Sequence, residues 1–158
     1  MKYRCLTDDE LQELEEEFKH FLIANNVYTE EWEALNANHD KRVIELVEMF
    51  SDIVFEKSLK KVRFLEQVTP AYMNFFYCED DQITMIAFTS ENNTIDFTED
   101  VSPDSAGEIS VYRVSKPYQL QREVELFQLM ESGAFIIDEE RYKKIELVYT
   151  YSLKQTQN

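Results

Sequence analysis

The sequence predicts an α+β protein in which helices precede an antiparallel sheet, and two patterns support this. Residues 40–66 place apolar side chains at spacings of three and four without a Gly or Pro, which is typical of a long helix. Residues 71–115 hold short aromatic and β-branched runs separated by polar turns, which is typical of strands. We expect an N-terminal helical hairpin with a long central helix, packed on an antiparallel sheet of four to five strands, plus one C-terminal helix.

The segment 40–66 is the predicted central helix. Val43, Leu46 and Phe50 fall on one face of such a helix, and past Glu56 the apolar positions rotate to a second face. A helix with two apolar faces is usually covered on two sides. We therefore expect this helix to lie at the centre of the core.

A shorter helical region precedes it. Thr7 and Glu10 have the spacing of a capping box, which predicts that a helix begins there, and Asn25 and Asn26 suit its C-terminal end. Thr29 is a typical cap for a short second helix. Because the connections are short, we expect the first and the central helix to pack antiparallel.

The predicted sheet is an antiparallel meander of four runs, at residues 71–78, 82–89, 94–98 and 108–115. A fifth strand is predicted at residues 145–151, where apolar and polar residues alternate.

A helix is predicted over residues 117–132, because Pro117 is tolerated in a first turn and Gly133 is a typical stop. The whole chain, residues 1–158, is predicted to be one domain. It has a helical half at residues 1–66 and a mainly β half at residues 70–152.

The net charge is the most unusual bulk property. The chain has 32 acidic and 16 basic residues, a formal charge of −16 at pH 7, and a pI near 4.4. Phosphate contacts and anionic lipid surfaces both require Lys and Arg, so we expect no direct nucleic-acid binding and no membrane binding. An acidic surface favours a basic partner or, more simply, keeps the protein in solution.

Several features predict a cytoplasmic protein. The opening residues MKYRC are followed by no apolar segment of the kind that forms a signal peptide, and no run of 18 apolar residues occurs. Cys5 and Cys78 are isolated thiols, which favours a reducing compartment over a disulfide-bonded one.

The motifs of common catalytic chemistry are absent from the sequence. His20 and His39 have no metal-ligand spacing, and Gly107 and Gly133 are too far apart to form a phosphate-binding loop. The acidic stretch 94–108 lacks the spacing of a calcium loop. We therefore expect no catalytic residue, no cofactor and no metal site.

The stretch from Phe64 to Tyr112 contains ten acidic residues and no Lys or Arg. Its aromatic residues are therefore predicted to pack in the core and not to stack on nucleic-acid bases. Acidic residues concentrate in the first helix and in the turns of the sheet. From these we predict a non-catalytic interaction module that binds a basic protein, such as one in a nucleic-acid-handling machine. The predicted contact residues are Glu13, Glu16, Glu17, Asp80, Asp81, Glu99 and Asp100.

Two other functions stay open. One is a regulatory domain that binds a small ligand in a pocket between the sheet and the central helix. The other is an enzyme that uses scattered carboxylates.

The N-terminal run MKYRCLTDDELQELEEEF and the later ELVEMFSDIVFEK resemble a conserved family of small proteins from Bacteroidota bacteria, a domain of unknown function. The likeness is strongest over about the first 66 residues. It implies a bacterial cytoplasmic protein and carries no catalytic residue onto this chain.

Overall fold

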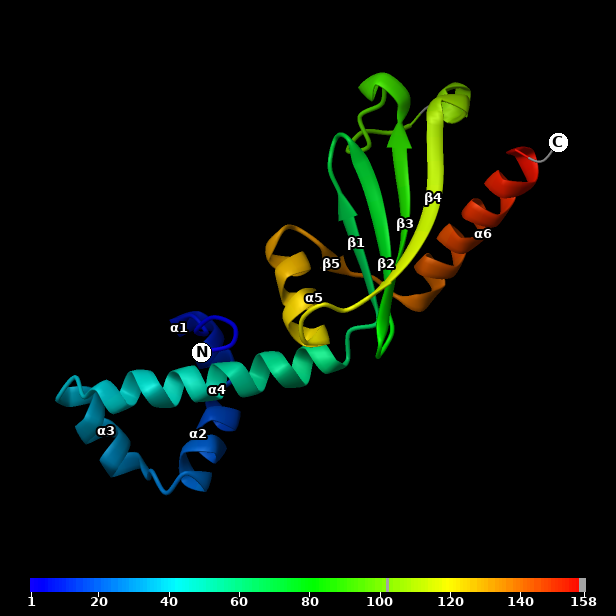
Figure 1. Cartoon of the computed structure of the whole chain (residues 1–158). Helices are drawn as coiled ribbons and strands as arrows, with labels where there is room; N and C mark the ends of the chain where they lie inside the picture. The colour runs from blue at the N-terminus through cyan, green and yellow to red at the C-terminus, as the bar shows by residue number, and fades with distance from the viewer. Residues whose placement is uncertain (102, 157–158) are drawn as a thin grey trace. The chain divides into compact units, whose positions relative to one another are not determined.

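The computed structural model describes residues 1–101 and 103–156, and its contacts divide the chain into two compact units, Met1–Lys60 and Lys61–Asn158. Each unit is described by itself. The described residues form six α-helices and one five-stranded antiparallel sheet, and the last of these elements is a helix (Figure 1). The predicted α+β class is confirmed.

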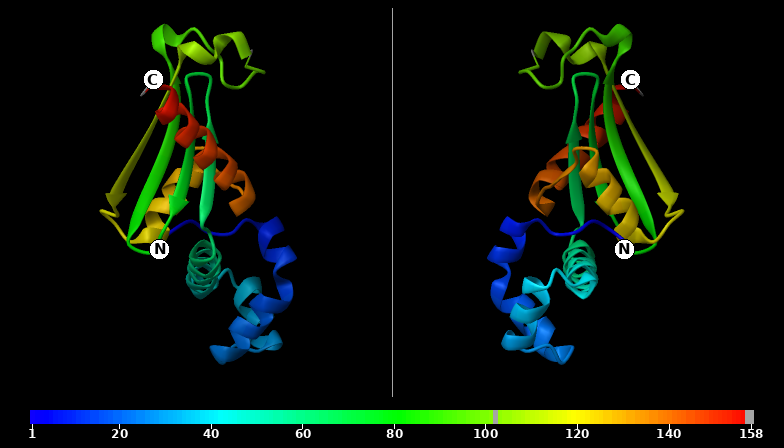
Figure 2. Two further views of the ribbon diagram at one scale, coloured as in Figure 1. Left: turned by 90° about the vertical axis from the view of Figure 1, so that its right-hand side faces the viewer. Right: turned by 90° about the vertical axis from the view of Figure 1, so that its left-hand side faces the viewer.

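Helices α1 (Asp8–Glu13), α2 (Glu15–Ala24), α3 (Thr29–Ala37) and α4 (Lys41–Lys60) make up the first unit. Its core consists of Leu22, Val27 and Leu46, with an aromatic cluster packed against it. In that cluster the Phe18 ring lies 4.9 Å from Phe50 and 5.2 Å from Trp32, centroid to centroid. In Figures 1 and 2, α2 crosses α4 at a steep angle, whereas the sequence predicts an antiparallel pair.

The predicted capping box is present at the start of α1. The Glu10 N–H donates to Thr7 Oγ1 at 3.2 Å, and the Thr7 N–H donates to Glu10 Oε2 at 2.8 Å. The Arg4 guanidinium also binds the Glu10 carboxylate, and these hydrogen bonds lower the pKa of Glu10 to about 2. The predicted end of the first helical region is also correct, since Asn26 adopts a left-handed conformation with φ 61°.

The N-terminal arm, residues 2–6, is held to α4 by side chains from one part of that helix. Ser51 is fully buried, and its Oγ accepts the Leu6 N–H at 2.9 Å while donating to the Val47 carbonyl at 2.7 Å. The Asp52 carboxylate accepts the N–H groups of Lys2 and Tyr3 at 2.9 and 3.1 Å. Three backbone donors of this arm, which has no regular secondary structure, are therefore satisfied by side chains of α4.

The central helix is shorter than predicted, because α4 ends at Lys60 and Phe64–Val68 form strand β1. The apolar positions that rotate past Glu56 explain the error. Leu59 is buried at the end of the helix, whereas Val62 and Leu65 belong to the chain that follows it. The change of apolar face marks a change of element and not a helix covered on two sides.

The second unit is built on a sheet with strand order β4-β3-β2-β1-β5. Its strands are β1, β2 (Tyr72–Cys78), β3 (Gln82–Ser90), β4 (Ile109–Pro117) and β5 (Phe135–Ile136), and every neighbouring pair is antiparallel. One end of the sheet carries the β2–β3 turn, and the other carries the connection from β3 to β4 with its two short 3₁₀ helices (Figure 1).

Two helices lie on opposite faces of this sheet, α5 (Arg122–Glu131) and α6 (Glu139–Thr156) (Figures 1 and 2). On the α6 face, Phe75, Ile86 and Tyr142 form a buried cluster. Glu66 of β1 is also buried there, and its carboxylate pairs with Arg141 of α6, whose Nε lies 3.1 Å from Glu66 Oε1. Burial thus reaches both faces of the sheet, which agrees with the apolar character of both faces of β2.

Two predicted strands in this half are wrong. Residues 94–98 form no strand, although Ile95 and Phe97 are buried as expected of apolar residues. Residues 145–151 belong to helix α6, where Tyr142, Ile145 and Tyr149 face the sheet at helical spacing and Leu147 and Tyr151 are exposed. The alternation of apolar and polar residues over 145–151 therefore does not mark a strand, because only some of these apolar residues lie on the buried face of the helix.

The helix predicted over 117–132 begins later, at Arg122, because Pro117 continues strand β4 and pairs with Gln82. Pro is tolerated there because an edge strand has one side free of ladder partners. The predicted stop is correct, since Gly133 has φ 110° and the Ala134 N–H donates to the Leu129 carbonyl at 3.0 Å.

The Arg122 side chain joins the start of α5 to the sheet. Its Nε donates to the Glu79 carbonyl at 3.0 Å, and its Nη2 donates to the carbonyls of Cys78, at 3.0 Å, and Val62. The residue is only 8% exposed. Arg122 therefore satisfies backbone acceptors at the end of β2 and ahead of β1 from within the protein.

The contact between Ser51 and the N-terminal arm gives a stability prediction. Ser51→Ala removes the acceptor of the buried Leu6 N–H and should lower the free energy of unfolding of the helical unit by about 1–2 kcal/mol. Urea unfolding followed by the fluorescence of Trp32, the chain's single Trp, measures it. Ser58→Ala is the matched control, since Ser58 is exposed on the same helix and should change stability by less than about 0.5 kcal/mol. Equal effects from the two variants would contradict the assignment.

Candidate ligand-binding site

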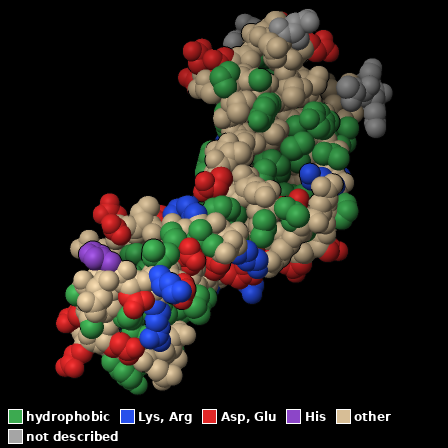
Figure 3. Space-filling model, turned by 60° about the vertical axis from the view of Figure 1, so that its left-hand side comes forward, with side chains coloured by type: hydrophobic (Ala, Val, Ile, Leu, Met, Phe, Trp, Pro, Cys, Tyr) green, Lys and Arg blue, Asp and Glu red, His purple; other side chains and the backbone are tan. Residues whose placement is uncertain are grey.

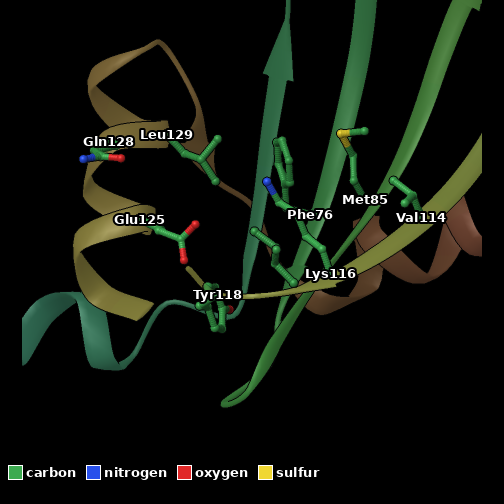
Figure 4. Close-up of a pocket in the computed structure, with 9 residues that line it drawn as sticks. Phe76, Met85, Val114, Lys116, Tyr118, Glu125, Gln128 and Leu129 are labelled. Carbon is green, nitrogen blue, oxygen red and sulfur yellow. The ribbon is translucent and has the colours of Figure 1, made fainter. Parts of the chain in front are cut away.

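A pocket of about 390 Å³ lies between α5 and the face of the sheet that α5 covers (Figure 4). Its walls come from three strands, from α5, and from the segment that joins β4 to α5. The lining residues are Phe76, Ile83, Met85, Val114, Lys116, Tyr118, Glu125, Gln128 and Leu129.

The sheet side of the pocket follows from strand register. Phe76 of β2 pairs with Met85 of β3, and Met85 pairs with Val114 of β4, so these side chains form one row across three strands. The next row on the same face contains Ile83 and Lys116, which also pair directly. Since alternate residues of a strand share a face, two adjacent rows give a continuous apolar floor with one ammonium group at its edge.

The helix side supplies the polar groups. Tyr118 Oη donates to the Glu79 carbonyl at 2.8 Å, and burial raises the pKa of this phenol, which keeps it neutral. Glu125 Oε2 accepts the Leu120 N–H at 3.4 Å. Figure 4 shows Glu125 and Lys116 as the charged groups that approach the pocket from the helix and from the sheet. Among the described residues, Lys116 forms no ion pair.

The Cys78 thiol, close to this site, is unreactive. Cys78 pairs with Ile83 in the second row and is fully buried, and burial raises the pKa of its thiol to about 12. A thiol with so high a pKa carries almost no thiolate at neutral pH. Cys78 is therefore a core residue.

A second, more polar pocket of about 350 Å³ lies on the opposite face of the sheet, beside α6. Thr84 and Ser115 hydroxyl oxygens lie 2.7 Å apart in it, and Lys143 pairs with Glu139 at 3.2 Å. Its lining residues are Phe64, Tyr77, Glu79, Thr84, Arg113, Ser115, Glu139, Tyr142, Lys143 and Glu146. Charges of both signs meet there.

The seven acidic residues predicted to bind a partner are all exposed. Glu13 is the last residue of α1, and Glu16 and Glu17 lie in the first turn of α2, so these three lie close together in sequence at the junction of the two helices. In the described residues, Glu16 lies 3.8 Å from Lys19 and Asp80 lies 2.8 Å from Arg63, while the other five form no ion pair. The face of the molecule in Figure 3 shows acidic side chains scattered over it, with Lys and Arg between them.

The acidic residues of the sheet unit fall into two separate groups. Asp80 and Asp81 lie in the β2–β3 turn, and Glu99 and Asp100 lie in the connection from β3 to β4. These are opposite ends of β3, whose nine residues span about 30 Å. The sheet therefore does not bring the two pairs together.

No group of three or more His, Cys, Asp or Glu residues in the described part of the chain is arranged to hold a metal ion. The side chain of Asp104, one of the acids weighed for a cation loop, lies outside the described residues. No helix in the described residues is long and apolar enough to cross a membrane.

Sequence reasoning missed the pocket residues. Val114 and Lys116 are visible in the sequence only as part of a strand, and Glu125 and Gln128 only as part of a helix. The signal that unites them is the pairing of β2, β3 and β4, which a single sequence does not specify. This pocket lies against α5, a helix from the same half of the chain as the sheet, and differs from the pocket predicted against the central helix, which stays a prediction.

Comparisons with known proteins agree with the family resemblance in the sequence and go no further toward a function. Neither the curated proteins nor the solved structures include a match to this chain. One family model matches residues 1–150, and it is described as a family of unknown function. The chain therefore belongs to that family, DUF6495.

Proposed function

We propose that this protein is a non-catalytic ligand-binding domain, and that the pocket between α5 and the sheet takes a small amphipathic molecule. The observation that carries the proposal is the two-row apolar floor, Phe76–Met85–Val114 and Ile83, bordered by the ammonium group of Lys116. Ligand pockets typically have this composition, mostly apolar with a few placed polar groups.

The size of the pocket supports a small molecule. Its volume of about 390 Å³ falls in the range of roughly 300–1,000 Å³ that is usual for ligand sites. Phe76 and Ile83 are buried at its base, while Val114 is 47% exposed at its open side. An apolar ligand would remove the exposed parts of these side chains from water, which is the main source of favourable free energy.

Charge supports an anionic head group on that ligand. Lys116 forms no ion pair among the described residues, whereas the Glu125 carboxylate already accepts the Leu120 N–H. A carboxylate, sulfonate or phosphate group on the ligand would therefore meet Lys116 with a charge-assisted hydrogen bond.

A binding role, without catalysis, fits the lining residues. Among the described residues that line the pocket there is no His, Cys or Ser, so these residues offer no nucleophile with an adjacent imidazole base. The Tyr118 hydroxyl is engaged by the Glu79 carbonyl, and its raised pKa makes it a poor base or nucleophile near pH 7.

Two dyes that differ mainly in charge test this proposal. N-phenylnaphthylamine is apolar and uncharged, and anilinonaphthalene sulfonate has a closely related body with a sulfonate. We expect both dyes to bind the folded protein with increased fluorescence. Val114→Trp should abolish the binding of both dyes, because the larger side chain fills the pocket. Lys116→Met should lower the affinity for the sulfonate dye by about tenfold, the usual contribution of one charge-assisted hydrogen bond. It should leave the affinity for the uncharged dye unchanged.

The matched control is Lys143→Met, which removes an exposed lysine that lies on the opposite face of the sheet and does not line this pocket. Circular dichroism of each variant confirms that it is folded. The proposal is wrong if neither dye binds, or if Val114→Trp leaves the binding of both unchanged.

We also propose binding of a basic protein as a second candidate, because all seven predicted contact residues are exposed and five of them form no ion pair in the described residues. The group Glu13, Glu16 and Glu17 supports it best, since the three concentrate negative charge at the junction of α1 and α2.

The basic-partner candidate predicts that a fluorescent oligolysine peptide binds at about 0.05 M salt and dissociates by about 0.3 M, where charges are strongly screened. Replacing Glu13, Glu16 and Glu17 with Gln should weaken that binding several-fold. The same change at Glu30, Glu31 and Glu33 of α3 alters the net charge equally and serves as control. Equal loss in both triple variants would mean that only net charge acts, and the predicted contact surface would be wrong.

A further inference from the structure

Strand β4 is an open edge of the sheet. All nine of its residues pair with β3, from Ser90↔Ile109 to Gln82↔Pro117, without a bulge. Within the described residues, no strand pairs with its other side, and residues 112–117 are all exposed. In an antiparallel edge strand, alternate N–H and C=O groups point away from the sheet. The opposite edge is different, because β5 has only two residues.

This edge also differs from the rest of the chain in charge. Between Ile109 and Pro117 there are two basic residues, Arg113 and Lys116, and no acidic residue, in a chain with twice as many acids as bases. Neither cation forms an ion pair with any described residue, and the Arg113 guanidinium lies 5.1 Å from the centroid of the Tyr149 ring. Edge strands are often protected by such charges, and Pro117 protects the last position. The four residues before Arg113, from Ile109 to Tyr112, are uncharged and give the strand no such protection.

Each face of the sheet carries a pocket that β4 itself helps to line. Val114 and Lys116 border the apolar pocket beside α5, and Arg113 and Ser115 border the polar pocket beside α6. A strand placed next to β4 would direct alternate side chains to these two faces. One set would approach the apolar pocket, and the other would approach Arg113.

We propose that β4 binds an extended peptide segment of a partner protein by strand addition, and that the segment alternates apolar and acidic residues. Backbone hydrogen bonds along β4 provide the affinity, and the two pockets select the side chains. Acidic residues of the segment face Arg113, and apolar residues face Val114. The proposal goes beyond small-ligand binding, because it depends on the free backbone of β4 and on Arg113, which a pocket ligand does not use.

Short fluorescent peptides about eight residues long, the length of an ordinary strand, test the proposal. The probe alternates Glu and Val. One control has the same composition in two blocks, a second carries methyl groups on alternate backbone nitrogens, and a third alternates Lys and Val. We expect only the first to bind in fluorescence anisotropy, and amide NMR shifts to change along β4 on binding.

Two variants locate the site. Arg113→Glu should lower the affinity for the Glu–Val peptide by about tenfold or more. Arg113→Gln, a milder change that preserves the fold, should lower it by about threefold to fivefold. Lys41→Glu is the matched control, because Lys41 is an exposed residue of α4 and its replacement changes the charge by the same amount as Arg113→Glu. It should leave peptide binding unaffected. The two dyes distinguish this proposal from pocket binding, because Arg113→Gln should not alter their affinity.

Several outcomes would overturn strand addition. They are an absence of binding by every peptide, equal binding of the blocked or N-methylated peptides, and shift changes that avoid β4. Concentration-dependent dimerisation that Arg113→Gln abolishes would instead identify a second copy of this chain as the occupant of the edge.

Discussion

The buried guanidinium of Arg122 is the interaction on which the second unit depends. From the start of α5, Arg122 contacts the chain ahead of β1 through the carbonyl of Val62 and the end of β2 through the carbonyls of Cys78 and Glu79. Carbonyl groups at the end of a hairpin must find donors when they are buried. By supplying those donors from the first turn of α5, Arg122 fixes where this helix begins against the sheet. The pocket follows, because Glu125, Gln128 and Leu129 lie on the same helix.

The sheet that Arg122 anchors carries different chemistry on its two faces. The face toward α5 is apolar with Lys116 at its border, and the face toward α6 combines an aromatic cluster with the ion pair of Glu66 and Arg141. Strand β4 contributes to both, because its alternate residues point to opposite faces. The pocket proposal and the strand-addition proposal therefore use neighbouring residues of one strand. A peptide bound along β4 and a molecule in the apolar pocket would compete only near Val114 and Lys116.

Local signals in the sequence predict the features that depend on local chemistry. The capping box of Thr7 and Glu10, the stop at Gly133 and the strands β2 and β3 are confirmed, because each depends on neighbouring residues. Strand β1 was missed, since FLEQV continues a helical pattern and becomes a strand only by pairing with β2 and β5. Helix α6 was mistaken for a strand because Ile145, Leu147, Tyr149 and Tyr151 alternate, and only packing on the sheet shows which of them are buried. The pocket could not be predicted from the sequence either, because the register of β2, β3 and β4 decides which side chains form its floor.

The role of Arg122 is tested most directly by comparing two arginines of the same unit. Urea unfolding followed by circular dichroism should show that Arg122→Met costs about 3–5 kcal/mol, since it removes a buried charged donor from the carbonyls of the buried residues Val62 and Cys78. Arg63→Met should cost at most about 1 kcal/mol, because Arg63 makes an exposed pair with Asp80. Trp32 fluorescence, which reports on the helical unit, separates the unfolding of that unit from the loss in the sheet unit. Equal and small costs for both variants would contradict the account.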